Sequence, residues 1–261
     1  MQHHDDTLAA FVAQESARDD AVAVVVAGSV ARGTPRPDSD VDVYLVVTEE
    51  RFRTAWDTGL VSYVDSAVAT YEGGYVDIKL ATLDYLRRAV EGADDPTRAS
   101  FRTAAVAWSR DPSVEGLVAA IPHLPDDAWA ERGRSYVAQL RLYVRYFLLQ
   151  GEAHDNTYLR YWAAVHAVNA GGRALLALNR TLFQGPKYLE KTVPALPRVP
   201  AGYAELAAAL LREPTAEHGG AYADAIEGLH DWGLAPEATL SRFVRDNELA
   251  WLTGGVPPEF S

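Results

Sequence analysis

Two short runs of β-branched apolar residues, separated by a turn-rich segment, constrain the fold of this chain most strongly. Residues 21–27 read Ala-Val-Ala-Val-Val-Val-Ala and end at Gly28, and residues 41–47 read Val-Asp-Val-Tyr-Leu-Val-Val. Runs of this length and composition are typical of strands in a sheet. Residues 33–38, Gly-Thr-Pro-Arg-Pro-Asp, predict a turn between them.

Further patterns complete the first part of the chain. Residues 5–19 carry apolar side chains at helical spacing ahead of the first strand. Two more extended segments are expected at about residues 61–71 and 75–81, and Glu-Gly-Gly at residues 72–74 suits a hairpin between them. The first part is therefore predicted to be a small mixed sheet with helices.

From about residue 82 the pattern is helical almost throughout. Proline and glycine clusters separate the predicted helices, which lie at residues 83–92, 126–150, 156–183, 203–212, 215–232 and 236–252. We place a domain boundary near residues 122–125. The prediction is an α+β fold, with a sheet-containing domain at residues 1–122 and an all-α helical-bundle domain at residues 123–261.

Composition excludes several classes of protein. With 261 residues, 48% of them hydrophobic, the chain can bury a sizeable core. It has no apolar run near the roughly 20 residues that span a bilayer, and no basic segment followed by an apolar one at the N-terminus. Cysteine is absent, which excludes disulfides and thiolate metal sites and is compatible with a reducing compartment. We expect a cytoplasmic protein that does not bind membranes.

The net charge of −12 lies mainly in residues 1–120. Binding to nucleic-acid phosphates requires a basic surface, so we expect no general nucleic-acid binding. Solubility and attraction of a cationic substrate both explain such a charge, and the sequence leaves both open. It does not predict the oligomeric state.

Three motifs in the first part carry chemistry, and the first is the turn at Gly28-Ser29. Glycine lets the backbone approach a phosphate closely, and the Ser29 hydroxyl can donate to a phosphate oxygen. A helix that begins at Ser29 would add exposed N–H groups and a favourable dipole. Taken alone, Gly-Ser after a strand is more often an ordinary strand-to-helix turn.

The second and third motifs are acidic. Side chains alternate along a strand, so Asp40, Asp42 and Tyr44 share one face while the intervening residues enter the core. In Tyr-Val-Asp-Ile-Lys-Leu at residues 75–80, Asp77 occupies the polar face. If the two strands are neighbours, three carboxylates surround one place, and such hard oxygen ligands suit magnesium. Each motif alone is more often a solvated strand residue.

Together these residues resemble the DNA polymerase β-like nucleotidyltransferases, whose signature is Gly-Ser, a short helix, Asp-x-Asp on the next strand and a later third carboxylate. The matching residues here are Gly28-Ser29, Asp40-Val41-Asp42 and Asp77, and the resemblance covers about residues 20–85. It implies that residues 1–122 form a nucleotidyltransferase catalytic domain.

That resemblance implies a set of catalytic roles. Asp40 and Asp42 would hold two Mg²⁺ ions that bridge the triphosphate of ATP or another nucleotide. Asp77 would either complete a metal shell or accept the proton of the attacking hydroxyl, and both roles stay open. Gly28 and Ser29 would cradle the distal phosphates. The expected products are a nucleotidylated acceptor and pyrophosphate.

Within the superfamily the chain looks most like the aminoglycoside and lincosamide nucleotidyltransferases, in which a helical domain follows the catalytic one. Residues 179–189, Asn-Arg-Thr-Leu-Phe-Gln-Gly-Pro-Lys-Tyr-Leu, resemble a segment in which a lysine contacts the triphosphate. Lys187 is therefore expected to bind the nucleotide together with Arg32. A small, cationic hydroxyl acceptor and a role in antibiotic resistance would fit this branch.

The acceptor and the base are less constrained. Some relatives take their general base from the helical domain, where the candidates are Glu152, His154 and Asp155. Aromatic side chains in that domain could stack on a base or sugar, although at helical spacing they are more often core; they are Tyr158, Tyr161, Trp162 and Tyr188.

Three other functions compete with small-molecule transfer. The first is AMP transfer to a protein or RNA in a toxin–antitoxin-like role, but such proteins are usually single short domains. The second is a nuclease-like helical domain, because Arg160 and His166 have the spacing of some RNase toxins. The third is a degraded nucleotide-binding module, which the three carboxylates and the Gly-Ser disfavour.

Overall fold

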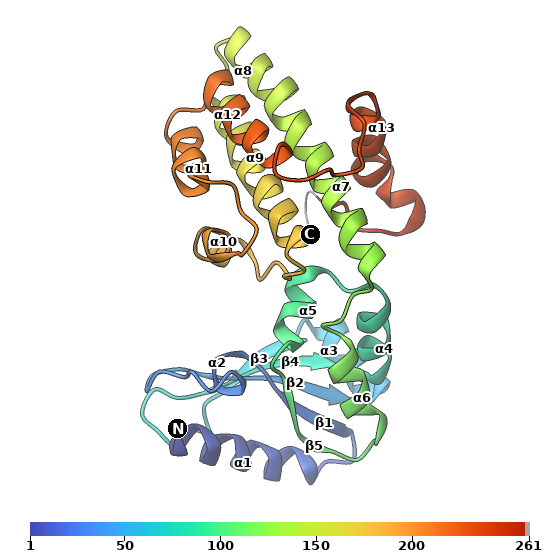
Figure 1. Ribbon diagram of the computed structural model, residues 1–261. Helices are drawn as coiled ribbons and strands as arrows, with labels where there is room; N and C mark the ends of the chain where they lie inside the picture. The colour runs from blue at the N-terminus through green and yellow to red at the C-terminus, as the bar shows by residue number, and fades with distance from the viewer. Residues whose placement is uncertain (259–261) are drawn as a thin grey trace. The chain divides into compact units, whose positions relative to one another are not determined.

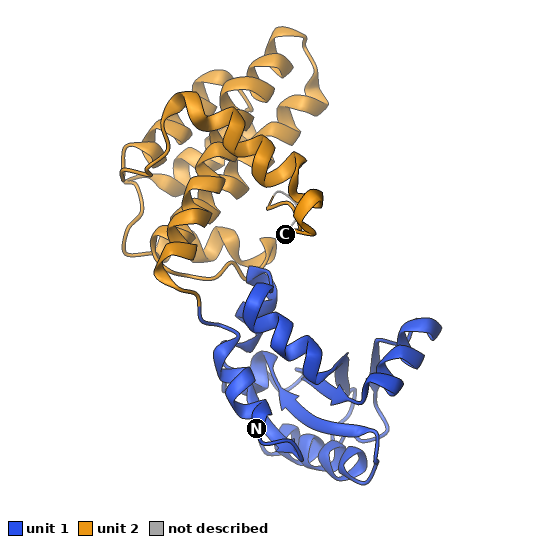
Figure 2. Cartoon of the chain, turned by 90° about the vertical axis from the view of Figure 1, so that its right-hand side faces the viewer, with its two compact units in different colours: residues 1–123 blue, residues 124–261 orange. Residues whose placement is uncertain are grey.

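A computed structural model describes residues 1–258 of the protein and shows two compact units, residues 1–123 and residues 124–261 (Figure 2). The first unit contains a sheet, and the second is built from helices (Figure 1). Within the described residues, no helix combines the length and apolar character needed to cross a membrane. The α+β fold expected from the sequence is confirmed.

The first unit is organised around a five-stranded mixed sheet in the order β3-β4-β2-β1-β5. β2 runs parallel to β4, and the other neighbouring strands are antiparallel. The strands are β1 (Ala21–Val26), β2 (Val41–Val47), β3 (Ser62–Asp65), β4 (Val76–Ala81) and β5 (Ala105–Ser109). Parallel pairing of β2 with β4 places the starts of both strands at the same edge of the sheet.

Six helices accompany the sheet, which has a hydrophobic core on each face. One core includes Phe11 of α1 and Ala55 of α3, and the other includes Leu86 of α4, Phe101 of α5 and Val118 of α6. The helices are α1 (Gln2–Ser16), α2 (Gly28–Ala31), α3 (Glu49–Thr58), α4 (Leu83–Gly92), α5 (Asp95–Phe101) and α6 (Ser113–Ala120). Because both faces are covered, β1 is a nearly continuous apolar run.

Several predicted boundaries in the first unit are wrong. The segment expected to be extended over residues 61–71 is a strand only at Ser62–Asp65, because turns occupy most of residues 66–74. The prediction of helix almost throughout after residue 82 missed β5, an edge strand that pairs with β1. Helix α1 ends at Ser16 and not near residue 19.

The second unit packs its helices around a separate core that includes Leu140, Leu175 and Tyr222. Its longest helices are α7 (Asp126–Leu142) and α9 (Thr157–Leu178). The others are α8 (Leu149–Ala153), α10 (Pro186–Thr192), α11 (Tyr203–Arg212), α12 (Ala216–Glu227) and α13 (Thr239–Phe243), with π-helical segments at Tyr143–Leu148 and Val244–Glu248 and single 3₁₀ turns at Val193–Ala195, Pro236–Ala238 and Ala250–Thr253.

The helical predictions hold in outline, but several bounds differ, the helix predicted at residues 215–232 ends at Glu227, and α10 was not predicted. The predicted helix at residues 126–150 continues through a π-helical segment to Ala153, and the one at residues 156–183 stops at Leu178. The core interpretation of the aromatic side chains is wrong for Tyr158, Tyr161 and Tyr188, which are 77%, 48% and 38% exposed. Trp162 does pack against the core.

Candidate active site

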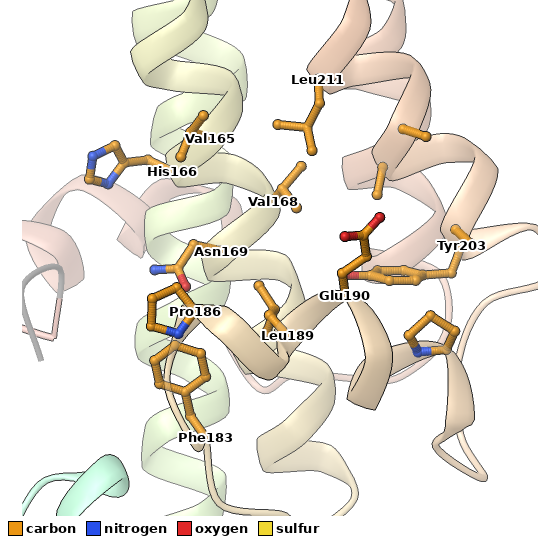
Figure 3. A pocket seen from close by; sticks show the side chains of 14 residues that line it. Val165, His166, Val168, Asn169, Phe183, Pro186, Leu189, Glu190, Tyr203 and Leu211 are labelled. Carbon is orange, nitrogen blue, oxygen red and sulfur yellow. The ribbon is translucent and has the colours of Figure 1, made fainter. Parts of the chain in front are cut away.

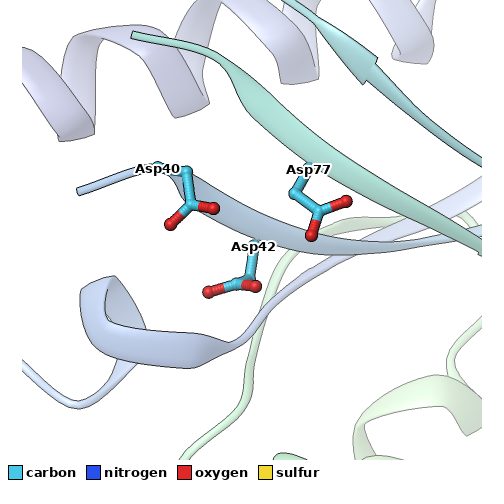
Figure 4. A group of neighbouring side chains, drawn as sticks. All are labelled: Asp40, Asp42 and Asp77. Carbon is cyan, nitrogen blue, oxygen red and sulfur yellow. The ribbon is translucent and has the colours of Figure 1, made fainter.

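Three carboxylates meet where β2 and β4 begin. Asp42 of β2 and Asp77 of β4 are paired in the parallel register, and Asp40 lies one residue before β2. Ligand oxygens of the three side chains lie within 4.8 Å of one another, and all three residues are half-buried (Figure 4). The register brings Asp77 beside the Asp pair despite the many residues between them.

The carboxylates lie next to the hydrophobic core on one face of the sheet, outside the part that helices cover. Further along the strands this face carries Tyr44 and then Val46, and Val46 and Ala81 are buried in the core beneath α4, α5 and α6. Side chains on one face of a strand follow each other every second residue. Asp42 and Asp77 therefore share a face with buried residues but remain open to a ligand.

The charge of Asp42 is unfavourable in this setting. Burial raises the pKa of its carboxyl above the ordinary value of 3.8, and the charges of Asp40 and Asp77 raise it further. Lys79 and Arg32 act in the opposite direction but do not cancel the shift. A cation bound among the three carboxylates would remove the repulsion, so the donor set and its electrostatics both fit a divalent metal ion.

Gly28 lies directly against Asp42. Its φ of +64° belongs to the left-handed region, and a Cβ at this position would lie 1.7 Å from Oδ2 of Asp42. The backbone amide of Ala27 also donates to the carbonyl of Asp42 at 2.9 Å. Only glycine allows the turn after β1 to come this close to the carboxylate.

The turn after Gly28 is a single helical turn. Helix α2 spans only Gly28–Ala31 and begins one residue earlier than predicted. Within the described chain, the amides of Ser29 and Val30 have no protein acceptor, as is usual at a helix start. So short a helix aligns few peptide dipoles, so an anion here would be held mainly by these N–H groups and the Ser29 hydroxyl.

A small cavity of about 90 Å³ adjoins the carboxylates and adds residues that the sequence did not single out. Its wall includes Lys79, Tyr44 and Ser100 in addition to Arg32. The Tyr44 hydroxyl lies 2.9 Å from the Ser100 hydroxyl, and the ring of Tyr44 stacks on a buried phenylalanine. The alternation of β4 places Lys79 on the face of Asp77 from the sequence alone; nothing local marked Ser100.

The segment before Asp40 is held by groups from distant elements. The carbonyl of Ser39 accepts a hydrogen bond from Nε2 of His4 at 3.0 Å and another from the hydroxyl of Tyr71. Next to the start of β4, the negative charge of the Asp40 carboxylate, together with a hydrogen bond to it, raises the pKa of the Tyr75 hydroxyl. These contacts fix the position of Asp40 outside the regular strand.

The remaining predicted residues belong to the second unit. Lys187 lies exposed on α10, with its ammonium 5.6 Å from the ring centroid of Tyr188. Glu152 accepts a hydrogen bond from the amide of Ala216 at the start of α12, and His154 and Asp155 follow α8 in an exposed turn. Their proposed roles in binding and proton transfer stay predictions.

The Arg160 and His166 pair has structural partners. Arg160 Nε donates to the carbonyl of Pro214 at 3.0 Å, and the His166 ring lies 4.5 Å from Trp162 and 5.1 Å from Tyr143. These contacts account for both side chains as parts of the helical packing, so they give no support to the nuclease hypothesis.

Comparison with known proteins identifies the first part of the chain. Residues 7–92 match the profile of the nucleotidyltransferase domain family. This part of the chain is therefore similar to nucleotidyltransferase domains. This match contains the turn at Gly28-Ser29 and all three carboxylates.

A solved structure resembles nearly the whole chain. It is a nucleotidyltransferase-like protein from Exiguobacterium sibiricum, 12% identical, with a TM-score of 0.52 over 93% of this chain and 77% of that one. At this identity the similarity shows the fold alone. No curated protein matches the sequence at a significant level.

Proposed function

We propose that this nucleotidyltransferase domain transfers a nucleoside monophosphate, AMP from ATP, to a hydroxyl group of a small cationic molecule such as an aminoglycoside-like antibiotic, with release of pyrophosphate. The observation that carries the proposal is the group of three carboxylates beside the turn at Gly28. The nucleotidyltransferase domain match supports the reaction class.

Asp40, Asp42 and Asp77 are the residues that would hold two Mg²⁺ ions. When bound, these ions neutralise the charge that develops on the α-phosphate and on pyrophosphate. Their presence would also relieve the repulsion that raises the Asp42 pKa. The protein itself contributes a fixed arrangement of ligands, since two of the three lie in register on adjacent strands.

The other residues of the site act on the triphosphate and the acceptor. The amides of Ser29 and Val30 donate to phosphate oxygens, and Arg32 and Lys79 neutralise phosphate charge. Asp77 accepts the proton of the acceptor hydroxyl. The oxygen of that hydroxyl attacks the α-phosphorus, and the bond from the α-phosphorus to the leaving pyrophosphate breaks. Lys187 is proposed as a further phosphate contact from the helical unit.

The choice of a cationic acceptor rests on charge. The whole chain carries −12, with most of the excess in residues 1–120, and a field of this sign concentrates cations near the surface. The resemblance to aminoglycoside and lincosamide enzymes favours the same class of acceptor. A cytoplasmic location is proposed because ATP and Mg²⁺ are required.

The test is pyrophosphate release from each nucleoside triphosphate with Mg²⁺, against a panel of aminoglycosides, lincosamides and tRNA. We expect release with ATP and an aminoglycoside, and a loss of roughly 100-fold or more in Asp42→Asn. Asp38→Asn is the matched control, because Asp38 is an exposed carboxylate on the same loop, 3.3 Å from Arg36. Full activity in Asp42→Asn would exclude the metal assignment, and release only with tRNA would exclude a small-molecule acceptor.

A further inference from the structure

The helical unit contains a cavity of about 560 Å³ that the proposed reaction does not use. It lies between α9, α10 and α11 (Figure 3). Most of its wall is apolar and includes Val165, Val168, Leu189, Ala207 and Leu211. Its size and lining are those of a small-molecule site, which is typically apolar with a few polar groups.

Small side chains create the space. The α11 wall presents Ala204, Ala207 and Ala208, so this helix fills little of the volume beside α9. Val165 of α9 is 54% exposed, and Leu211, at the end of α11, is 40% exposed. Apolar side chains left exposed around a concavity provide hydrophobic surface that a ligand can bury.

Four polar side chains line the cavity, and they are His166, Asn169, Glu190 and Tyr203. Glu190 is an exposed residue of α10, and its carboxylate points toward the space between α9 and α11 (Figure 3). Within the described residues it forms no salt bridge, and the ammonium of Lys187 on the same helix lies over Tyr188 instead. Asn169 of α9 lies near the proline that begins α10 and adds an amide.

Contacts outside the cavity hold the helices that form its wall, which favours a preformed site. The Tyr222 hydroxyl donates to the carbonyl of Val168 at 3.1 Å and lies 3.3 Å from the Tyr203 hydroxyl. A Cβ on Gly172 of α9 would lie 3.0 Å from a methyl group of Leu189, so α10 packs tightly on α9 below the cavity. These contacts hold the three helices in place around the space.

We propose that this cavity binds a small amphiphilic amine, with its apolar group among α9, α10 and α11 and its ammonium paired with Glu190. Glu190 is the one acidic side chain among the described residues that line the cavity. The lining includes no lysine or arginine, and its histidine, His166, has its ring 4.5 Å from that of Trp162 and 5.1 Å from that of Tyr143. A carboxylate without an ionic partner beside an apolar surface favours a cation over a neutral or anionic ligand of equal size.

The test compares three probes that share a cyclohexyl group: cyclohexylmethylamine, cyclohexylmethanol and cyclohexanecarboxylate. Binding to the full chain is measured by ligand-observed NMR titration without nucleotide or Mg²⁺, so failure of the proposed transfer reaction does not affect it. We expect the amine to bind most tightly and the carboxylate least tightly. Absence of amine binding, or equal binding of the carboxylate, would overturn the proposal.

Variants locate the site. Glu190→Gln is expected to weaken amine binding about tenfold and to leave the alcohol unchanged, because only the charge is removed. Glu205→Gln, on the same unit but outside the cavity lining, is the matched control and should bind the amine as the wild type does. Ala208→Phe on one wall and Val165→Phe on the other should each abolish binding. Retention of binding in both filled variants, each shown to be folded by circular dichroism, would place the amine elsewhere.

Discussion

Gly28 is the residue at which the backbone and the carboxylate cluster approach each other most closely. Its positive φ would cost an L-residue about 1–2 kcal/mol by itself. Its contact with Asp42 adds a steric conflict that no rotation of a new methyl group would relieve. The two effects can be separated, because Gly33 has a similar φ of +72° but no other atom lies within 4 Å of the place that its Cβ would take.

Gly28→Ala is therefore expected to reduce pyrophosphate release by roughly 100-fold or more, because Asp42 must move away from its position. Gly33→Ala should retain activity within a fewfold and lose only the stability that the left-handed conformation costs. The measurement is kcat/KM for both variants, with thermal denaturation alongside. An equal loss of kcat/KM in the two variants would show that the backbone conformation of the glycine, and not its contact with Asp42, accounts for the loss of activity.

The charge of Asp42 lowers the conformational stability of the metal-free protein. Because its pKa is raised in the folded state, the native state binds more protons than the unfolded state between pH 3.8 and the raised pKa. Stability therefore decreases as pH rises through that window, and the penalty persists at neutral pH.

Asp42→Asn should stabilise the protein in EDTA at pH 7 by roughly 1 kcal/mol, which corresponds to about 3 °C in Tm for a domain of this size. Addition of Mg²⁺ should raise the Tm of the wild type and not that of the variant. Differential scanning fluorimetry with and without Mg²⁺ measures both effects. A lower Tm for the variant in EDTA would contradict the unfavourable charge.

Among the elements, α1 has a role beyond covering the sheet. Its first turn holds the segment before β2, because His3 hydrogen-bonds to the carbonyl of Pro37 at 3.2 Å and His4 to that of Ser39 at 3.0 Å. Thr7 also bonds to Thr70 in the loop before β4. The helix thus connects the segments that carry Asp40 and Asp77.

His4 makes this connection sensitive to pH. Burial lowers its pKa below the ordinary value of 6.5, so the unfolded state takes up a proton before the folded state does. Stability from this group is fully present above about pH 6.5 and is lost as pH falls below it.

His4→Gln should show a shallower decrease in Tm between about pH 7 and pH 5 in EDTA than the wild type. His154→Gln, an exposed control in the other unit, should keep the wild-type slope; equal slopes in all three proteins would exclude the effect.

At the scale of the whole molecule, the two units have separate cores and separate stabilising contacts. In the helical unit, Arg141 is largely buried and connects three segments. It bonds to Glu227 at 2.7 Å, to the carbonyl of Leu234 at 3.0 Å and to Thr239 at 3.1 Å. Removing Arg141 would leave the Leu234 carbonyl and the Thr239 hydroxyl without this donor, while Glu227 keeps its ion pair with Arg145 at 2.8 Å.

We expect two calorimetric transitions with different responses. Mg²⁺ should raise the transition temperature of only the unit that contains the carboxylates. Arg141→Ala should lower the transition temperature of only the helical unit, because that unit loses about 3 kcal/mol of its free energy of unfolding. A single transition that both Mg²⁺ and Arg141→Ala move would show that the units unfold together.

Much of the sheet was predictable because its signals are local. The apolar runs of β1 and β2, the alternation in β4 and the glycine after β1 each depend on a few consecutive residues. β5 was missed because it is a short edge strand whose pairing, Val26 with Ala105, joins distant parts of the chain. Ser100 and His4 were missed for the same reason, since they reach Tyr44 and Ser39 across 56 and 35 positions.

The sequence by itself determined which residues are candidates for the chemistry: a glycine that permits close approach, and carboxylates on the polar side of their strands. Spacing and alternation suffice for that, because strand geometry has a fixed period of two. Only the tertiary structure decided that β4 lies beside β2 in the register that pairs Asp77 with Asp42. Neighbour and register depend on burial of both sheet faces by helices far along the chain, and no local pattern encodes that packing.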